Sequence, residues 1–214
     1  MNVRGKHIVV TGGSLGIGRE TAKSLIKKGA LVLVTGRSQE RLETSFGDLE
    51  CQTIAFDIGD SLNIERNAQR CLEMLNGKVD VLVNNAGIGE RKSIEELTIE
   101  SFQKVFNVNV FGLALFTKEI VPVMKRNNGG TIINIGSTAS LKGYPTGSIY
   151  ASSKFAVRCL TQCWQAELRP HNIRVCQINP SEVTTAFGNP DRIERDEVHN
   201  KLTSKEIAHA ITSA

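Results

Sequence analysis

Aromatic side chains are scarce in this sequence: they make up 5% of its 214 residues, and only one is a tryptophan. So few rings offer little stacking surface for single-stranded nucleic acid. The formal net charge of +4 is small and dispersed, which argues against nucleic acid and membrane surfaces as partners. Long apolar runs are also missing, since residues 30–34 form one of the longest, far below the roughly 20 residues of a membrane-spanning helix. We therefore predict no nucleic-acid partner and no membrane partner.

Cysteine pairs and histidine clusters are lacking as well. The five cysteines are an odd number without a CxxC pair, so we expect reduced thiols and a cytoplasmic location. Cys159 and Cys163 lie four residues apart on a predicted helix, and we interpret them as small core residues. The four histidines are too scattered for a metal site, and none is predicted. The N-terminal apolar stretch is too short for a signal peptide.

The chain does contain a regular alternation of short apolar runs and longer helical patterns. The runs are typical of parallel strands buried on both faces, and they occupy residues 7–10, 31–35, 53–56, 79–83, 131–135 and 174–178. Helices are expected over 17–28, 39–46, 62–75, 99–125, 149–168 and 204–213. Gly29 is expected to cap the first helix, and Pro122 to kink or end the fourth. This alternation predicts one α/β domain over 1–214, a doubly wound parallel sheet with helices on both faces.

A glycine-rich turn connects the first strand to the first helix. Residues 11–18 read TGGSLGIG, with the glycines spaced as GxxxGxG. Glycines let the backbone approach a pyrophosphate, whose charge is attracted by free N–H groups and by the helix dipole. The strand before the turn and the helix after it favour dinucleotide binding over a tight turn that binds nothing. The expected cofactor contacts in this segment are Gly12, Ser14, Leu15, Gly16, Ile17 and Gly18.

The end of the second strand bears on the choice between the two nicotinamide cofactors. Gly36 occupies the place of the carboxylate that bonds the ribose 2′-hydroxyl of NAD(H), and Arg37 follows it. A cation there suits the 2′-phosphate of NADP(H), although an arginine at a helix start is also a common surface charge. The sequence therefore favours NADP(H) over NAD(H). Asp57, after the third strand, could accept a hydrogen bond from the adenine amino group or cap the next helix.

Tyr150 and Lys154 form the strongest candidate for proton chemistry. They are four residues apart at the start of a long predicted helix, so both side chains lie on one face, about 5–6 Å apart at Cβ. A free tyrosine has a pKa near ~10, and a nearby ammonium group lowers it, which would make Tyr150 a usable acid and base. Ser137, at the end of the fifth strand, could hold the same carbonyl oxygen. Without further context such a pair is more often an ordinary helix-surface pair.

Further context comes from motifs that occur in the order and spacing of one family. They are the glycine turn of residues 11–18, the NNAG of residues 84–87, Asn109, Ser137, and Tyr150 with Lys154. On these motifs the sequence resembles the short-chain dehydrogenases/reductases along essentially its whole length. Within that family it is similar to the 3-oxoacyl-[acyl-carrier-protein] reductases. The resemblance implies a Rossmann fold, a nicotinamide cofactor and the reduction of a carbonyl to a secondary alcohol, or the reverse.

The resemblance also implies roles for single residues. Tyr150 would be the general acid that protonates the substrate oxygen, and Ser137 would orient the carbonyl. Lys154 would lower the pKa of Tyr150 and bind the nicotinamide ribose. Asn109 would hold a water that links Lys154 to solvent, whereas Asn107 is expected on the helix surface.

Two loops complete the site that the resemblance implies. Asn85, Ala86 and Gly87 would lie beside the cofactor, although such a segment is also typical of a turn that packs under the strand ends. After the sixth strand, Pro180 and Thr185 fit the family pattern, and Val183 could meet the carboxamide through its backbone. Ser181 replaces the usual glycine. The substrate loop is expected over about 181–203, and its many charges are interpreted as a solvated face.

The end of the chain departs from the family pattern. Family members usually continue to a seventh strand, whereas this sequence stops at Ala214, so that strand is absent or truncated. It would pair at the sheet edge and contribute to subunit contacts. We expect a homodimer or homotetramer built on the faces of helices 99–125 and 149–168.

The expected partner is a small-molecule carbonyl or alcohol, with 3-oxoacyl thioesters as the best single class. Arg91 and Lys92 could attract an acidic acyl carrier protein. A sugar or polyol, a pteridine side-chain ketone and a xenobiotic ketone stay open as substrates. A regulatory protein that binds NADP(H) without turnover is the alternative from another class. The combination of Asn109, Ser137, Tyr150 and Lys154 favours the enzyme.

Overall fold

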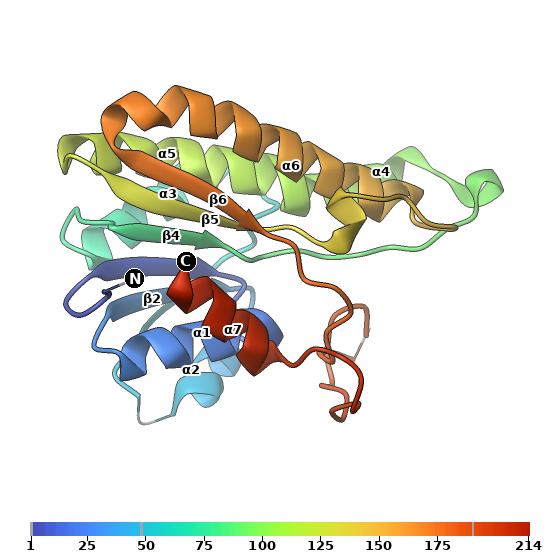
Figure 1. Cartoon of the computed structure of the whole chain (residues 1–214), viewed down its shortest axis with the longest axis horizontal. Helices are drawn as coiled ribbons and strands as arrows, with labels where there is room; N and C mark the ends of the chain where they lie inside the picture. Colours follow the sequence, from blue (N-terminus) through green and yellow to red (C-terminus); the bar gives the residue numbers. More distant parts are fainter. Residues whose placement is uncertain (1, 48, 190) are drawn as a thin grey trace.

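A parallel sheet forms the centre of the molecule, and helices cover both of its faces (Figure 1). This computed structural model describes residues 2–47, 49–189 and 191–214. The strands within them are β1 (His7–Thr11), β2 (Leu31–Gly36), β3 (Gln52–Ala55), β4 (Val81–Asn84), β5 (Gly130–Ile135) and β6 (Ile173–Ile178). Their order is β3-β2-β1-β4-β5-β6, and every neighbouring pair is parallel. The predicted doubly wound, Rossmann-type α/β fold is confirmed.

Each face of the sheet has its own hydrophobic core. Successive side chains of a strand point to opposite faces, so Val9 packs into one core and Val10 into the other, both without solvent exposure. One face is covered by α1 (Gly16–Lys27), α2 (Gln39–Phe46) and α7 (Ser204–Ser213). The other face is covered by α3 (Ile64–Met74), α4 (Ile99–Phe106), α5 (Leu113–Arg126) and α6 (Ser148–Leu168). Burial on both faces explains why the strands are apolar throughout.

The fourth predicted helix is interrupted, but not at its proline. A π-helical segment, η2 (Asn107–Gly112), separates α4 from α5. Pro122 lies inside α5, which continues to Arg126, so the prediction that it could end the helix is wrong. Within η2, Gly112 passes so close to the Ile58 carbonyl that any Cβ would collide with it. Gly29 does follow α1 as predicted, with a positive φ of 82°.

Two further predictions concern the cysteines of α6 and a metal site. Cys159 and Cys163 are exposed on α6, so they are not core residues, because their shared helix face points away from the sheet. In the part of the chain that the structure describes, no three histidine, cysteine or acidic side chains are grouped to hold a metal ion.

One helical stretch, Ile99–Arg126, is long and apolar enough by length and composition to cross a membrane. The sequence analysis did not detect it, since only uninterrupted apolar runs were counted. In the structure part of this stretch belongs to the protein core, where Phe116, Ile120 and Met124 are fully buried against the sheet, whereas Ile99 and Phe111 are exposed. A core helix of an α/β fold passes the same test, so the finding is weak evidence for a membrane span.

Candidate active site

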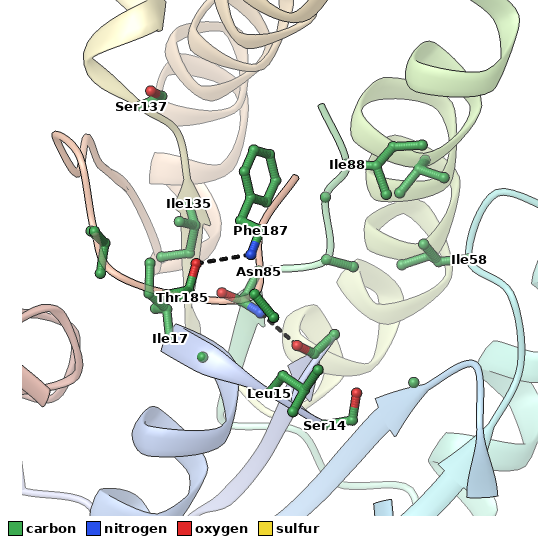
Figure 2. A pocket seen from close by; sticks show the side chains of 18 of the residues that line it. Ser14, Leu15, Ile17, Ile58, Asn85, Ile88, Ile135, Ser137, Thr185 and Phe187 are labelled. Carbon is green, nitrogen blue, oxygen red and sulfur yellow. Dashed lines mark hydrogen bonds between the residues drawn. The ribbon is translucent and has the colours of Figure 1, made fainter. Parts of the chain in front are cut away.

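The carboxyl ends of the parallel strands surround one deep cavity (Figure 2). The strand order reverses between β1 and β4, so the loops after these two strands diverge and leave a crevice. The cavity brings together most of the predicted residues: Gly12, Ser14, Leu15, Gly16, Ile17, Arg37, Asp57, Asn85, Ala86, Gly87, Ser137, Tyr150, Lys154, Pro180, Val183 and Thr185. Two predicted residues, Gly18 and Asn109, lie behind its wall instead of lining it.

The loop that follows β4 packs against the glycine turn and holds it in place. Gly12 has a positive φ of 67°, and a Cβ on it would lie 2.6 Å from the Cα of Ala86. The Thr11 hydroxyl accepts hydrogen bonds from the backbone N–H groups of Asn85 and Ala86, each at 3.1 Å. The Asn85 amide donates to the carbonyls of Thr11 and Gly12, each at 2.9 Å. Figure 2 shows the Asn85 side chain directed at the glycine turn. Asn85 therefore positions the turn, and this is the packing role that the sequence had left open.

The N-terminus of α1 holds an anion supplied by the chain itself. The Gly16 N–H donates to Oε1 of Glu194 at 2.8 Å, and Arg19 forms an ion pair with Oε2 at 2.7 Å. Glu194 belongs to the segment interpreted as a solvated face; it is exposed, and its carboxylate also contacts Gly16 and Arg19. A free N–H at the positive end of a helix attracts negative charge, and the carboxylate satisfies it. The glycine turn is thus a working anion site, as a pyrophosphate would require.

Asp57 and Arg37 also line the cavity. Asp57 accepts a hydrogen bond from the Gly59 N–H at 2.8 Å, while the N-cap of α3 is Asn63. The alternative that Asp57 caps the next helix is therefore wrong, and its carboxylate lines the cavity. Arg37 lines it too, together with Arg192, which the sequence analysis had not singled out.

Burial dominates the electrostatics of Tyr150 and Lys154. Burial raises the pKa of Tyr150 to about 12, against a lowering influence of the Ser137 hydroxyl. Burial likewise lowers the pKa of Lys154 to about 8. The Lys154 Nζ lies 5.8 Å from the centroid of the Tyr150 ring and donates to the Ile135 carbonyl at 2.8 Å. The expected lowering of the Tyr150 pKa by Lys154 is therefore absent here, because the amine is directed at a carbonyl and the phenol is desolvated.

Asn109 connects the loop after β4 to the catalytic helix. Its side chain is 1% exposed, whereas Asn107 is exposed. The Asn109 Oδ1 accepts from the Ile88 N–H, and its Nδ2 donates to the Ile88 carbonyl, both at 2.9 Å. Nδ2 also donates to the Ser153 hydroxyl at 3.0 Å, which in turn donates to the Tyr150 carbonyl at 2.7 Å. The π-helical turn directs Asn109 inward, and such turns are frequent at functional sites.

Ser153 and Phe187 are site residues that the sequence analysis missed. Ser153 is fully buried between Tyr150 and Asn109, and its signal was its place one turn after Tyr150 on the same helix face. Phe187 packs on Tyr150 with ring centroids 5.5 Å apart, although the loop that carries it is rich in charged residues. Figure 2 shows the Phe187 ring at the cavity. A single aromatic residue in a charged loop gave no periodic signal, so only the tertiary structure reveals this contact.

A second cavity adjoins the first at Ser137 and Tyr150 and opens toward solvent. Its rim carries charges of both signs, and the acids among them are paired. Glu90 forms ion pairs with Lys92 at 3.6 Å and Lys104 at 3.1 Å. Arg91 lies over the Tyr144 ring at 5.7 Å. Arg91 and Lys92 were both expected to attract an acidic carrier protein. Within the described chain, only Arg91 of the two lines this opening and forms no ion pair with an acidic side chain.

Comparisons with known proteins agree with this geometry. A family model described as short chain dehydrogenase matches residues 6–196. A 3-ketodihydrosphingosine reductase from Bacteroides thetaiotaomicron is 32% identical over 180 residues, covering 84% of this chain and 65% of the relative. The Mus musculus protein of the same name is 32% identical over 190 residues, covering 85% of this chain and 57% of the relative. The chain thus spans less than two thirds of the length of both relatives.

Solved structures superpose closely. An alcohol dehydrogenase from the archaeon Thermococcus sibiricus, complexed with 5-hydroxy-NADP, gives a TM-score of 0.89 at 31% identity, over 97% of this chain and 89% of that one. A candidate betaketoacyl-ACP reductase gives a TM-score of 0.86 at 30% identity, over 98% of this chain and 90% of that one.

Proposed function

Because the chain belongs to the short-chain dehydrogenase family, we propose that it is an NADP(H)-dependent oxidoreductase that reduces a carbonyl to a secondary alcohol, or catalyses the reverse. One observation carries the proposal. Ser137, Tyr150 and Lys154 line the same cavity as the glycine turn, so a proton donor and a dinucleotide site meet at one place. A dinucleotide site alone would support only binding.

The residues around the glycine turn fit a dinucleotide. The Gly16 N–H already binds a carboxylate, and Gly12, which has no Cβ, lets the turn pack directly on Ala86. Arg37, and the absence of an acidic side chain at Gly36, support NADP(H) over NAD(H). When bound, the reduced cofactor supplies the hydride that the carbonyl carbon accepts.

The proton comes from the protein. Tyr150 is protonated at neutral pH, since burial raises the pKa of its phenol to about 12, and it donates the proton to the substrate oxygen as negative charge develops there. The Ser137 hydroxyl holds the same oxygen and orients the carbonyl. Lys154 places positive charge behind the phenol, so the phenolate left after transfer is stabilised.

Reprotonation of Tyr150 requires a route to solvent. Gly87 lies between the two groups that would form it, because a Cβ there would be 3.4 Å from Asn109 Oδ1 and 3.6 Å from Lys154 Nζ. In this route Asn109 would hold a water, and its hydrogen bonds to Ile88 and Ser153 fix the loop and helix on either side. Ser153 is a positioning residue, because its hydroxyl donates to the Tyr150 carbonyl and so holds the backbone of Tyr150 in place.

The substrate we propose is a 3-oxoacyl thioester. Phe187 gives the mouth of the site an apolar wall, and Arg91 provides a cation for an acidic carrier protein. The likeness to a candidate betaketoacyl-ACP reductase supports this class. The likeness to proteins named 3-ketodihydrosphingosine reductase favours a long-chain ketone as the second candidate. We further propose a cytoplasmic homodimer or homotetramer.

Replacing Tyr150 by phenylalanine tests the proposal. Purified Y150F should lose at least about a hundredfold of the NADPH-dependent reduction of 3-oxoacyl thioesters, because general acid catalysis contributes about 10²–10⁴-fold. Its dissociation constant for NADPH should stay within about twofold of the parent value, since the phenol does not contact the adenosine half. Y144F is the matched control, because Tyr144 is the other tyrosine of the chain.

The same measurement separates the enzyme from a regulator. Tight NADPH binding without oxidation in the presence of any ketone or aldehyde from a broad panel would favour a protein that binds the cofactor without turnover. Turnover that persists in Y150F would exclude the proposed proton donor.

A further inference from the structure

Besides Arg37, a second arginine reaches the cofactor cavity, from the far end of the chain. Arg192 lies between β6 and α7, yet it lines the same cavity as Arg37, which directly follows β2. Figure 1 shows the C-terminal segment passing the carboxyl ends of the strands before α7 packs beside α1. Burial, followed by repulsion from Arg37 and Arg41, lowers the pKa of the Arg192 guanidinium. Arg41 lies in the first turn of α2, so cations from separate segments converge there.

This group of like charges has no acidic counterpart. In the described residues, none of Arg37, Arg41 and Arg192 forms an ion pair with a carboxylate. The Nε of Arg192 is buried and has no hydrogen-bond partner there. Buried polar atoms are nearly always hydrogen-bonded, so an unpartnered guanidinium nitrogen inside a cavity points to a missing ligand.

The backbone holds Arg192 in place despite an unfavourable conformation. Its φ is 58°, in the left-handed region that a residue with a side chain rarely adopts. The Arg192 N–H donates to the Asn189 carbonyl at 3.1 Å, and the Asn189 amide donates to the Ile193 carbonyl at 3.0 Å. These bonds do not involve Glu194, so the turn does not depend on the contact between Glu194 and the glycine turn. Strain of this kind at a cavity wall is typical of a functional residue.

We propose that Arg192 is a specificity-determining residue that closes over the 2′-phosphate of the cofactor's adenosine ribose, completing with Arg37 and Arg41 a site for a phosphate monoester. The inference rests on the proposed NADP(H)-dependent function and adds a residue to it. A phosphate dianion accepts charge-assisted, paired hydrogen bonds from guanidinium groups and neutralises their repulsion. NAD(H) has a hydroxyl at that place and would leave the three cations uncompensated.

Two nucleotides that differ only in this phosphate test the proposal by calorimetric titration. They are adenosine 2′,5′-bisphosphate and adenosine 5′-monophosphate, and neither takes part in turnover. R192A should weaken binding of the bisphosphate about tenfold or more, as expected for a lost charge-assisted hydrogen bond, and change binding of the monophosphate less than about twofold. R192G should behave like R192A, although it relieves the backbone strain.

The matched control is R195A, which removes one positive charge from the same segment. A selective loss in R192A but not in R195A supports the proposal. An equal loss of bisphosphate binding in both variants would show that the effect comes from the overall positive charge of the segment, and it would overturn the proposal. Unchanged bisphosphate binding in R192A, while the parent protein still prefers the bisphosphate, would overturn the role of Arg192 and leave the proposed function standing. A parent protein without that preference would overturn both.

Discussion

At the scale of single residues, the site contains ionisable side chains whose burial lowers the stability of the folded protein. Lys154 is 4% exposed, and its amine has the Ile135 carbonyl as its hydrogen-bond partner within the described chain. Burial penalises the charged amine, and this lowers its pKa to about 8. The same desolvation raises the pKa of Tyr150 to about 12. A charged amine beside a desolvated phenol is unfavourable for folding but strengthens their interaction once the phenol loses its proton.

The Lys154 pKa predicts how stability depends on pH. The amine has a lower pKa in the folded protein, about 8, than the ordinary value of 10.5, so the unfolded chain binds more protons between these values. The contribution of Lys154 to the free energy of unfolding should therefore rise as the pH rises from 8 to 10.5. K154M should be more stable than the parent by about 1–2 kcal/mol at pH 7, after the loss of one hydrogen bond.

Urea denaturation at several pH values measures this difference. The advantage of K154M should shrink as the pH rises from 8 toward 10.5, because the amine of the folded parent is neutral there and the amine of the unfolded chain progressively loses its proton. K78M, which removes an exposed lysine, should show no such trend. A K154M variant that is less stable than the parent at pH 7 would mean that Lys154 is not penalised by burial.

At the scale of elements, a chain of buried polar side chains ties the strands to the helices above them. The Asn84 amide donates to the Thr117 hydroxyl and to Asn134 Oδ1, both at 2.9 Å. The Asn134 amide then donates to the Thr161 hydroxyl at 2.9 Å, and that hydroxyl donates to Gln177 at 3.1 Å. The bonds join β4, β5 and β6 to α5 and α6. They fix the helix that carries Tyr150 relative to the sheet.

Removing the central member of this chain should be costly. N134A deletes two hydrogen bonds and leaves polar partners buried, so it should lower the free energy of unfolding by about 2–4 kcal/mol. Chemical denaturation gives the value, with N200A as an exposed asparagine control that should change stability by less than about 0.5 kcal/mol. A loss of similar size in both variants would contradict the structural role of the chain.

Glu194, in the segment between β6 and α7, leads to a further prediction. Its carboxylate binds the Gly16 N–H, where the pyrophosphate of a dinucleotide would place its charge. E194Q keeps the shape and removes the charge, so NADPH should bind about two- to fivefold more tightly, as expected for loss of a competing charge at a helix N-terminus. Fluorescence titration with NADPH measures this, with E197Q as the control from the same segment. Weaker binding in E194Q would show that the carboxylate does not compete with the cofactor.

At the scale of the whole molecule, one helical side of the protein leaves large apolar side chains in solvent. Ile99 is 63% exposed, Phe111 51% and Phe155 42%, and they lie on α4, η2 and α6. Cys159 and Cys163 extend the exposed face of α6. Such side chains are commonly buried between subunits, which supports the proposed homo-oligomer.

Sedimentation velocity at micromolar concentration tests the assembly. The parent protein should sediment as a dimer or tetramer, and F155E should shift it toward smaller species, since a charge would enter an apolar interface. L62E is the control, because Leu62 is 94% exposed and lies in the turn before α3, not on α4, η2 or α6. A parent protein that is monomeric under these conditions would exclude the proposed interface.

The sequence by itself determined the alternation of strands and helices and the segments that carry the site. Buried parallel strands have to be apolar on both faces, so every strand was found to within two residues at either end. The glycine turn, Ser137, and the pair Tyr150 and Lys154 were identifiable because their chemistry depends on spacing along one element. The break in the fourth helix was misplaced at Pro122, whereas the structure has it at η2, where Gly112 packs against Ile58 from a distant part of the chain.

Only the tertiary structure decided which residues the charged segment between β6 and α7 contacts and which group the Lys154 amine faces. Glu194 and Arg192 are separated from the glycine turn and from Arg37 by most of the chain, and no periodic pattern records such a contact. The direction of the Tyr150 pKa also escaped prediction, because desolvation depends on what surrounds the phenol in space. Spacing within an element is written in the sequence, whereas burial and contacts between distant segments arise only when the chain packs.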